Sequence, residues 1–440
     1  MDEERFGLDG LIELYAGERS GDPLGHARGL GTLGVILITL RAFTLARRRL
    51  DEADAIARRS ADPAAIAMTV FGRGWLDFVT GSLDDARASF QRSAAAFNSI
   101  GDVRGWGGPC CLLYWVFYWR AEFASIGELA ANMLGTGQRA GDPHLTSWGQ
   151  NGLGLLALTV GPLDEAAAHL SAVCDLTGRI SSFRMQAGAG GLLAICRLRQ
   201  GRLTEAAAAV ATSLALIEAR NLRGEWSADP LNAFAELCLA RAARLTGAPR
   251  REALRAARRA CAKALRCTRH AVAWLPATER LRGTLAWLSR DPRSARARWR
   301  ASLAAAEGLG MVLERARTLL EIGQWSRDVA LVDEALGVFD RIGARVDSAF
   351  ALHARARVGS VAGAHDAAAL EDYDRAIAAL DEVKAEYELG VACRSRARLH
   401  QGLGHLDLTR ADLARARDCF AATGAAEDLA AVKGEASALG

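Results

Sequence analysis

The chain has 440 residues, of which 50% are hydrophobic and only 6% aromatic, and it carries a formal net charge of +4 at pH 7. This length is too great for one ordinary hydrophobic core, so it predicts either several domains or a repeat array. The small net charge favours no class of partner by itself. The apolar residues are largely alanine, leucine and valine, which suit close-packed helices.

Cysteine use and hydropathy predict a cytoplasmic protein. The nine cysteines include no C-x-x-C pair, which is typical of reduced thiols in a cytosolic core. The acidic opening Met1-Asp2-Glu3-Glu4 is unlike a secretory signal. The most apolar runs, residues 30–40 and 110–119, are about half the ~20 residues needed to span a bilayer, so we expect no membrane segment. The arginine-rich composition, with three lysines, is typical of a bacterial genome rich in G and C.

An internal repeat of 40 residues is the main organising feature. Aspartate recurs at this interval, and proline follows three of the four copies. The aspartates are Asp22, Asp62, Asp102 and Asp142. Aspartate followed by proline is a helix-start pattern, because the carboxylate caps free N–H groups and proline fits the first helical position. A fixed period of this length predicts stacked copies of one helical unit.

Other positions recur with the same period and outline the unit. A small residue recurs inside the first helix at Gly34, Gly74 and Gly154, and an alanine recurs in the second helix at Ala46 and Ala86. These spacings predict pairs of helices of about 16–18 residues, joined by short turns. Small residues let the helices approach closely, and a large residue four positions after the alanine fills the remaining space.

The motif that starts at Gly74 and continues through Gly81-Ser82-Leu83-Asp84-Asp85-Ala86 to Phe90 resembles the tetratricopeptide (TPR) pattern. Its longer period, and joints such as Phe97-Asn98-Ser99-Ile100-Gly101-Asp102, resemble the MalT-like TPR region of large bacterial signal-transduction ATPases. The resemblance implies an all-α, right-handed superhelical solenoid of about ten antiparallel helix pairs. It also implies a regulatory region that works with an ATPase, a nucleotide cyclase or a DNA-binding domain.

The repeat divides the chain into two parts. Residues 1–226 are expected to form regular 40-residue units, and residues 227–440 to form helix pairs of less regular length. Stepping back 40 residues from Ala46 reaches Phe6, so residues 1–20 are expected to form the second helix of an incomplete unit. We therefore expect the chain to work as part of a longer architecture.

Aromatic residues gather in the second to fourth repeats and suggest a groove. Trp75 and Trp115 share one repeat position, and Phe78 lies three residues after Trp75 on the same helix face. If that face is concave, neighbouring repeats form an aromatic groove for a peptide or small effector. The candidate lining residues are Phe71, Trp75, Phe78, Trp115, Tyr118, Trp119 and Trp148. The alternative, which is narrowly favoured, is that these rings fill the core between small neighbours.

Residues 250–300 carry fifteen basic and three acidic side chains. Five arginines lie near helical spacing and form a candidate docking stripe for an acidic partner domain: Arg251, Arg255, Arg258, Arg266 and Arg269. A solvated outer face is the favoured alternative. Nucleic-acid binding is disfavoured, because no interleaved aromatic residues or recognition module accompany the charge.

We expect no catalytic, cofactor-binding or metal-binding residues in this chain. It contains no phosphate loop and no zinc-protease or paired-cysteine motif. The sequence Gly29-Leu30-Gly31-Thr32-Leu33-Gly34 matches G-x-G-x-x-G, but it lies inside an expected helix and is better explained by close helix packing.

These observations predict a non-enzymatic scaffold or sensor that binds a protein, peptide or small effector and relays this binding to a signalling partner. The alternative is the regulatory C-terminal region of an ATP-dependent transcriptional regulator or of a class III adenylate or guanylate cyclase, with catalytic domains outside this chain.

Overall fold

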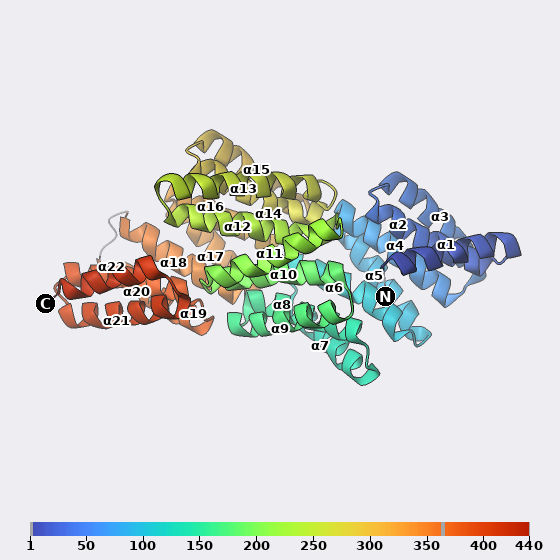
Figure 1. The fold of residues 1–440 in the computed structure, drawn as a ribbon, viewed down its shortest axis with the longest axis horizontal. Coiled ribbons are helices and arrows are strands. Elements are labelled where there is room, and N and C mark those ends of the chain that lie inside the picture. Colours follow the sequence, from blue (N-terminus) through green and yellow to red (C-terminus); the bar gives the residue numbers. More distant parts are fainter. Residues whose placement is uncertain (1–2, 362–365, 440) are drawn as a thin grey trace.

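The computed structural model describes residues 3–361 and 366–439, which form an elongated array of helices (Figure 1). Within these residues there are 22 α-helices and two short 3-10 turns, and no strand. The predicted all-α, TPR-like solenoid is confirmed. Helices α2 to α21 make up ten antiparallel pairs, with α1 before them and α22 after them.

The helices form two layers that follow the chain. The even-numbered helices from α2 to α20 pack on one another and form the inner layer, and each is followed by a helix of the outer layer. The even-numbered helices are α2 (Pro23–Thr39), α4 (Pro63–Thr80), α6 (Val103–Trp119), α8 (Pro143–Val160), α10 (Phe183–Arg199), α12 (Ala228–Arg244), α14 (Leu275–Leu288), α16 (Val312–Ser326), α18 (Arg345–Val361), α20 (Glu386–Gly402) and α22 (Ala426–Ser437). The odd-numbered helices are α1 (Glu3–Ser20), α3 (Phe43–Ser60), α5 (Leu83–Ser99), α7 (Phe123–Ala140), α9 (Leu163–Arg179), α11 (Leu203–Ala219), α13 (Gly247–Thr268), α15 (Pro292–Gly308), α17 (Val329–Ile342), α19 (Asp366–Glu382) and α21 (Leu406–Thr423).

The repeated aspartates start the first four inner helices, as the sequence predicts. Each carboxylate accepts hydrogen bonds from backbone N–H groups of the first turn. Asp62 accepts from the Ala65 N–H at 2.8 Å, and Asp102 from the Gly105 N–H at 2.7 Å. These bonds satisfy donors that a helix start otherwise leaves unpaired.

The recurring glycines allow close packing within and between pairs. A Cβ added at Gly34 would lie 2.5 Å from the Leu50 side chain of the same helix pair. A Cβ added at Gly72, which belongs to the next pair, would lie 2.6 Å from the same Leu50 side chain. Gly29 of the G-x-G-x-x-G sequence lies inside α2, where an added Cβ would come 2.4 Å from Leu14 Cα. That glycine run therefore serves helix packing, as predicted.

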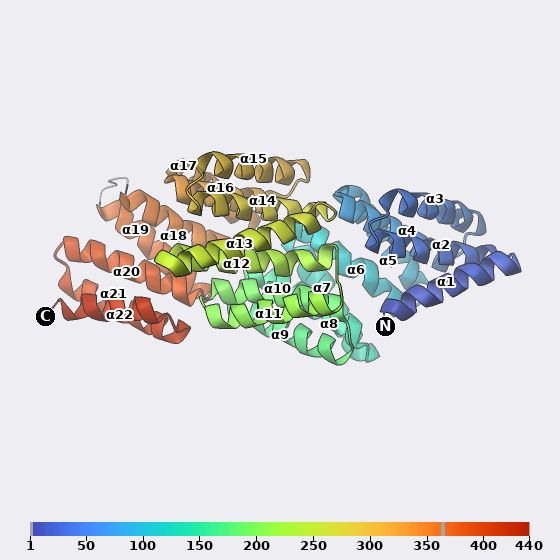
Figure 2. The same ribbon diagram turned by 45° about the horizontal axis from the view of Figure 1, so that its top comes forward.

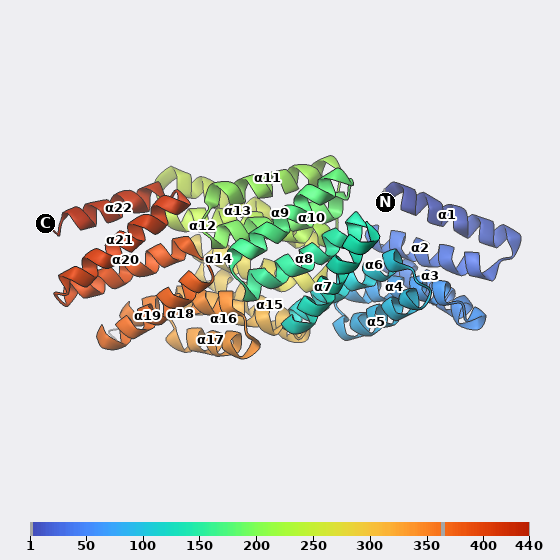
Figure 3. The ribbon, with the colours of Figure 1, turned by 90° about the horizontal axis from the view of Figure 1, so that it is seen from below.

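Successive turns of the superhelix touch, which fills the middle of the molecule. Helix α6 packs on α16, α8 on α18, and α4 on the 3-10 turn η2 (Val272–Trp274). The Arg317 guanidinium in α16 donates to the Tyr118 hydroxyl in α6 at 2.7 Å, across 199 residues of sequence. Helices α1–α5 form one end of the array and α18–α22 the other (Figures 1 and 2). Seen from below, α6, α8, α14 and α16 occupy the middle (Figure 3).

Helix lengths become uneven after the 3-10 turn η1 (Glu225–Ser227). The helices from α2 to α11 have 17 or 18 residues. Beyond η1, α13 has 22 residues while α14 and α17 have 14. Both 3-10 turns lie directly before an inner helix and carry a tryptophan, Trp226 in η1 and Trp274 in η2.

Candidate binding groove and interior cavities

An open groove of about 650 Å³, here called the N-terminal groove, lies on the inner layer near the start of the chain. Its lining comes from α1, α2, α4, the end of α5, α6, α8, the start of α10, and η1. Phe71 and Trp75 of α4 form part of its wall with their ring centroids 5.7 Å apart, and Trp148 of α8 and Trp226 of η1 also line it. All four side chains are partly exposed. Groove volumes of about 300–1,000 Å³ are usual for ligand sites.

Charged groups of both signs stand among the aromatic rings of this groove. Arg104 pairs with Asp142 at 3.2 Å, and its guanidinium lies 5.9 Å from the centre of the Trp148 ring. Arg28 pairs with Glu13 of α1 at 3.0 Å. The groove can therefore offer apolar contact together with both donors and acceptors.

The other sequence-predicted aromatic residues lie deeper. Phe78 is 0% exposed, Trp119 is 4% exposed, and Trp115 is 8% exposed. Their rings pack around Trp274 of η2, whose centroid lies 5.7 Å from those of Phe78 and Trp115 and 4.9 Å from that of Trp119. These three residues do not line the open groove, while partly exposed Tyr118 binds Arg317.

Two interior cavities meet at Asp229, the second residue of α12. The larger has about 100 Å³ and is bounded by Trp115, Trp119, Trp274 and several charged side chains. The smaller has about 20 Å³ and shares Trp115, Asp229 and Trp274 with the larger one. It also shares Met185 and Trp226 with the N-terminal groove. The groove and the two cavities therefore lie next to one another in a series along the inner layer.

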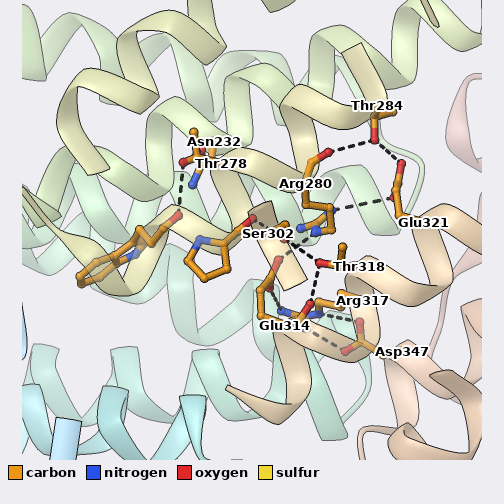
Figure 4. Close-up of polar contacts among 12 residues, drawn as sticks. Asn232, Thr278, Arg280, Thr284, Ser302, Glu314, Arg317, Thr318, Glu321 and Asp347 are labelled. Carbon is orange, nitrogen blue, oxygen red and sulfur yellow. Dashed lines mark hydrogen bonds and ion pairs between the residues drawn. The ribbon is translucent and has the colours of Figure 1, made fainter. Parts of the chain in front are cut away.

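A buried ion network forms part of the wall of the larger cavity. Figure 4 shows its polar contacts. The Arg317 guanidinium donates to both carboxylate oxygens of Asp347 in α18 at 2.8 Å, and Arg199 of α10 approaches the same carboxylate at 3.4 Å. The Arg317 and Asp347 side chains are 12% and 6% exposed. Burial acts to raise the pKa of Asp347, but Arg317 and Arg199 outweigh it and hold that pKa below its usual value. The network thus joins helices from successive turns.

A second part of the network belongs to α14 and α16. Arg280 donates to Glu314 at 2.8 Å, and the Thr284 hydroxyl donates to Glu321 at 2.6 Å. In Figure 4 these side chains extend from neighbouring inner helices toward one another. The acids and bases of this part of the network are thus paired with one another.

Asp229 differs from these paired acids. Its Oδ1 accepts a hydrogen bond from the Trp274 indole N–H at 2.9 Å, and among the described residues no arginine or lysine pairs with it. Burial raises the pKa of Asp229 to about 7, while the Trp274 hydrogen bond acts in the opposite direction. The same cavity holds the charged groups Glu236, Arg199, Arg280, Glu314 and Arg317. Burial is the main cause that raises the pKa values of Tyr114 and Cys267, and the charge of nearby Asp229 acts in the same direction.

We expect Asp229→Asn to stabilise the protein increasingly as the pH rises from about 4.5 to 8. The folded state binds this proton more tightly than the unfolded chain, whose ordinary pKa is 3.8. The contribution of the Asp229 carboxyl to the free energy of unfolding is therefore fully present below about pH 4, and it is lost as the pH rises through about 7. Each pKa unit corresponds to about 1.4 kcal/mol. Urea unfolding across this pH range measures the difference, with Asp407→Asn as a fully exposed control. A difference that does not change with pH would refute the assignment.

The predicted basic stripe lies on the outer helix α13 and its C-terminal residue Arg269. All five arginines are exposed. Arg258, Arg266 and Arg269 line an open cleft of about 550 Å³ between α13, α14 and α15. No ion pair involves these three side chains in the described part of the chain. The cleft is thus a basic surface separate from the N-terminal groove.

Sequence reasoning missed several residues around the cavities, above all Glu225, Trp226, Asp229 and Trp274. The Trp75 indole N–H donates to Glu225 at 2.9 Å, which fixes η1 against α4. The sequence did contain an indication of these residues, because Trp226 and Trp274 lie in the part of the chain where the 40-residue spacing becomes irregular. A large aromatic residue at a connection between helices that departs from the repeat indicates a packing or binding role outside the repeat pattern.

Over residues 3–361 and 366–439, no group of three or more histidine, cysteine, aspartate or glutamate side chains could hold a metal ion. The nine cysteines are unpaired, and burial raises the pKa of the Cys196 thiol to about 12. None of the described helices has the length and apolar character of a membrane span.

Comparisons with known proteins place the fold. No protein-family model and no curated protein matches the chain. A solved Rap protein complexed with competence and sporulation factor is 12% identical, with a TM-score of 0.55 over 82% of this chain and 99% of its own. The apo form of RapI is 11% identical, with a TM-score of 0.48 over 63% and 96%. Yeast Tom70 is 11% identical, with a TM-score of 0.37 over 94% and 95%.

At these identities the comparisons show the fold alone. The structural neighbours are TPR-like helical repeat proteins. The chain is an all-α solenoid of the same TPR-like architecture.

Proposed function

We propose that this chain is a non-enzymatic TPR-like scaffold that binds a peptide segment in the N-terminal groove and relays that binding to a signalling partner. The observation that carries the proposal is the groove itself, about 650 Å³ in volume and walled by Phe71, Trp75, Trp148 and Trp226. A peptide supplies side chains for the aromatic wall and main-chain donors and acceptors for Arg104 and its neighbours. The solved complex of the similar Rap fold with competence and sporulation factor supports this reading.

The groove is also preformed. Seven separate helices and η1 contribute to its lining, and Trp75 is held by its hydrogen bond to Glu225. A preformed site loses less conformational entropy on binding than a loop that must order. This arrangement suits a receptor that holds one extended segment across several repeats.

We further propose that the basic cleft on α13–α15 is where the signalling partner docks. Its unpaired arginines Arg258, Arg266 and Arg269 fit an acidic protein surface. By resemblance, the partner is an ATPase, a nucleotide cyclase or a DNA-binding regulator of the kind that carries MalT-like TPR regions. Such docking weakens with rising salt, because exposed charges are screened.

Selection of a displayed random-peptide library on the intact chain tests the groove. We expect enriched peptides to lose at least tenfold in affinity for Gly108→Leu, which is about 1.4 kcal/mol. Gly108 lines the groove, and a Cβ there would lie 3.6 Å from the Phe71 ring, so the leucine fits against the wall and occupies peptide space.

Gly434→Leu is the matched control, because Gly434 is an exposed glycine of α22 with no atom within 4 Å of an added Cβ. It should leave binding unchanged. Failure of any peptide to enrich, or equal binding to Gly108→Leu, contradicts the proposal. A small effector that binds the groove without a peptide would replace the peptide as ligand.

A further inference from the structure

We propose that the cavities around Asp229 form a receptor for a flexible alkyl chain ending in an ammonium group, such as a lysine side chain or a free alkyl diamine. The site is the inner end of the series that begins at the N-terminal groove, and the inference rests on the proposed peptide-binding function. It adds the chemical class that the innermost part of the ligand must have.

The first observation is a half-buried carboxylate that faces two cavities and has no cation beside it among the described residues. Asp229 lines both cavities, and its one hydrogen bond comes from the Trp274 indole N–H. The three nearby arginines are engaged elsewhere: Arg317 and Arg199 contact Asp347, and Arg280 contacts Glu314. A charge largely removed from water is normally paired, so the Asp229 carboxylate favours either a proton or a cationic ligand.

The charges of the cavity wall and of the ion network behind it, taken together, favour the cation. The larger cavity and its ion network contain five carboxylates and three guanidinium groups. The carboxylates belong to Asp229, Glu236, Glu314, Glu321 and Asp347, and the guanidinium groups to Arg199, Arg280 and Arg317. An ammonium group entering this wall reduces the excess of negative charge.

The second observation is the aromatic lining of the small cavity. The small cavity is lined by the rings of Phe78, Trp115, Trp226 and Trp274. Tryptophan rings attract cations through their negative faces, and aromatic side chains combined with a carboxylate are a recurrent solution for binding ammonium groups.

The third observation is an acceptor left without a donor. Asn151 of α8 lines the small cavity and is 2% exposed. Its side-chain N–H donates to the Tyr114 hydroxyl at 2.9 Å, while its Oδ1 is buried and accepts no hydrogen bond from the described residues. An ammonium group has three donors, so it can supply the hydrogen bond that Oδ1 lacks.

The shape of the site selects an ammonium rather than a guanidinium group. A compact ammonium group is close to a water molecule in size, whereas a guanidinium group is a larger planar fork of three nitrogens. The small cavity of about 20 Å³ suits one water-sized group, and the adjoining 100 Å³ leaves room for methylene groups.

The test measures tryptophan fluorescence and calorimetric binding of four probes to the intact chain. The probes are cadaverine, N-acetyl-lysine methylamide, its arginine analogue and the uncharged norleucine analogue. We expect the two ammonium probes to bind at least tenfold more tightly than the other two. Preference for cadaverine over the lysine probe indicates a free diamine as the natural source, and the reverse preference indicates a peptide lysine.

Asp229→Asn keeps the acceptor for Trp274 and removes the charge, so we expect at least a tenfold loss of ammonium binding without loss of stability at pH 8. Asp77→Asn is the control, because Asp77 is buried in α4 but lines neither cavity. Equal binding of lysine and norleucine probes, or unchanged binding by Asp229→Asn, overturns the inference. If the ammonium inference fails in this way but selected peptides still lose affinity for Gly108→Leu, the proposed peptide function remains supported. Ammonium binding without any peptide binding would identify a free alkyl diamine as the ligand of the cavities and would contradict the proposed peptide function.

Discussion

Arg317→Ala is expected to lower the free energy of unfolding by about 3–5 kcal/mol, the range for breaking a buried ion pair and leaving one charge uncompensated. The guanidinium donates to both oxygens of Asp347 and to the Tyr118 hydroxyl, so its loss leaves this buried carboxylate with only the longer 3.4 Å contact from Arg199 and separates α16 from α6. Urea unfolding measures the change. Because this contact joins successive turns, we also expect the single transition to broaden or split.

The matched control is Arg345→Ala. Arg345 pairs with Glu382 at 3.2 Å, but the two side chains are 62% and 64% exposed, so its removal should cost less than about 1 kcal/mol. A loss of similar size for both variants would contradict the account of the ion network. A double-mutant cycle of Arg317 with Asp347 isolates the interaction energy of the pair.

Phe78→Ala is expected to destabilise the protein by about 3–5 kcal/mol, because it removes a fully buried ring and leaves a cavity beside Phe90, Trp119 and Trp274. Trp75→Ala should cost only about 1–2 kcal/mol. Trp75 is partly exposed on the N-terminal groove, and the main loss is its hydrogen bond to Glu225.

This pair of substitutions separates a core ring from a groove ring on the same helix. Thermal and urea unfolding of both variants provides the comparison. If Trp75→Ala proves as costly as Phe78→Ala, Trp75 belongs to the core and the groove loses the wall on which the proposed function depends.

The sequence repeat was enough to predict the local architecture. The spacing of Asp22, Asp62, Asp102 and Asp142 marked four helix starts, and the glycine positions marked close helix packing. Both depend on hydrogen bonds and contacts within one or two neighbouring repeats. Such local requirements recur with the repeat, so they leave a periodic pattern in the sequence.

Contacts between turns of the superhelix left no such pattern. Tyr118 and Arg317 are 199 residues apart and occupy unrelated repeat positions. The same contacts explain why Trp75 and Trp115 differ although they share a repeat position. The turn η2 covers Trp115 and the end of α4 through Trp274, while Trp75, further from that end, stays open to the groove. Repeat position alone therefore could not separate groove residues from core residues.

The most direct test of the central claim is to map where a selected peptide binds. A peptide enriched on the intact chain, carrying a photoreactive group, is crosslinked and the attachment sites are found by mass spectrometry. We expect attachment in the groove segments 64–75, 104–108 and 144–148, and loss of attachment in Gly108→Leu. Attachment to the outer helices α3, α5 or α13, unaffected by that substitution, would contradict it.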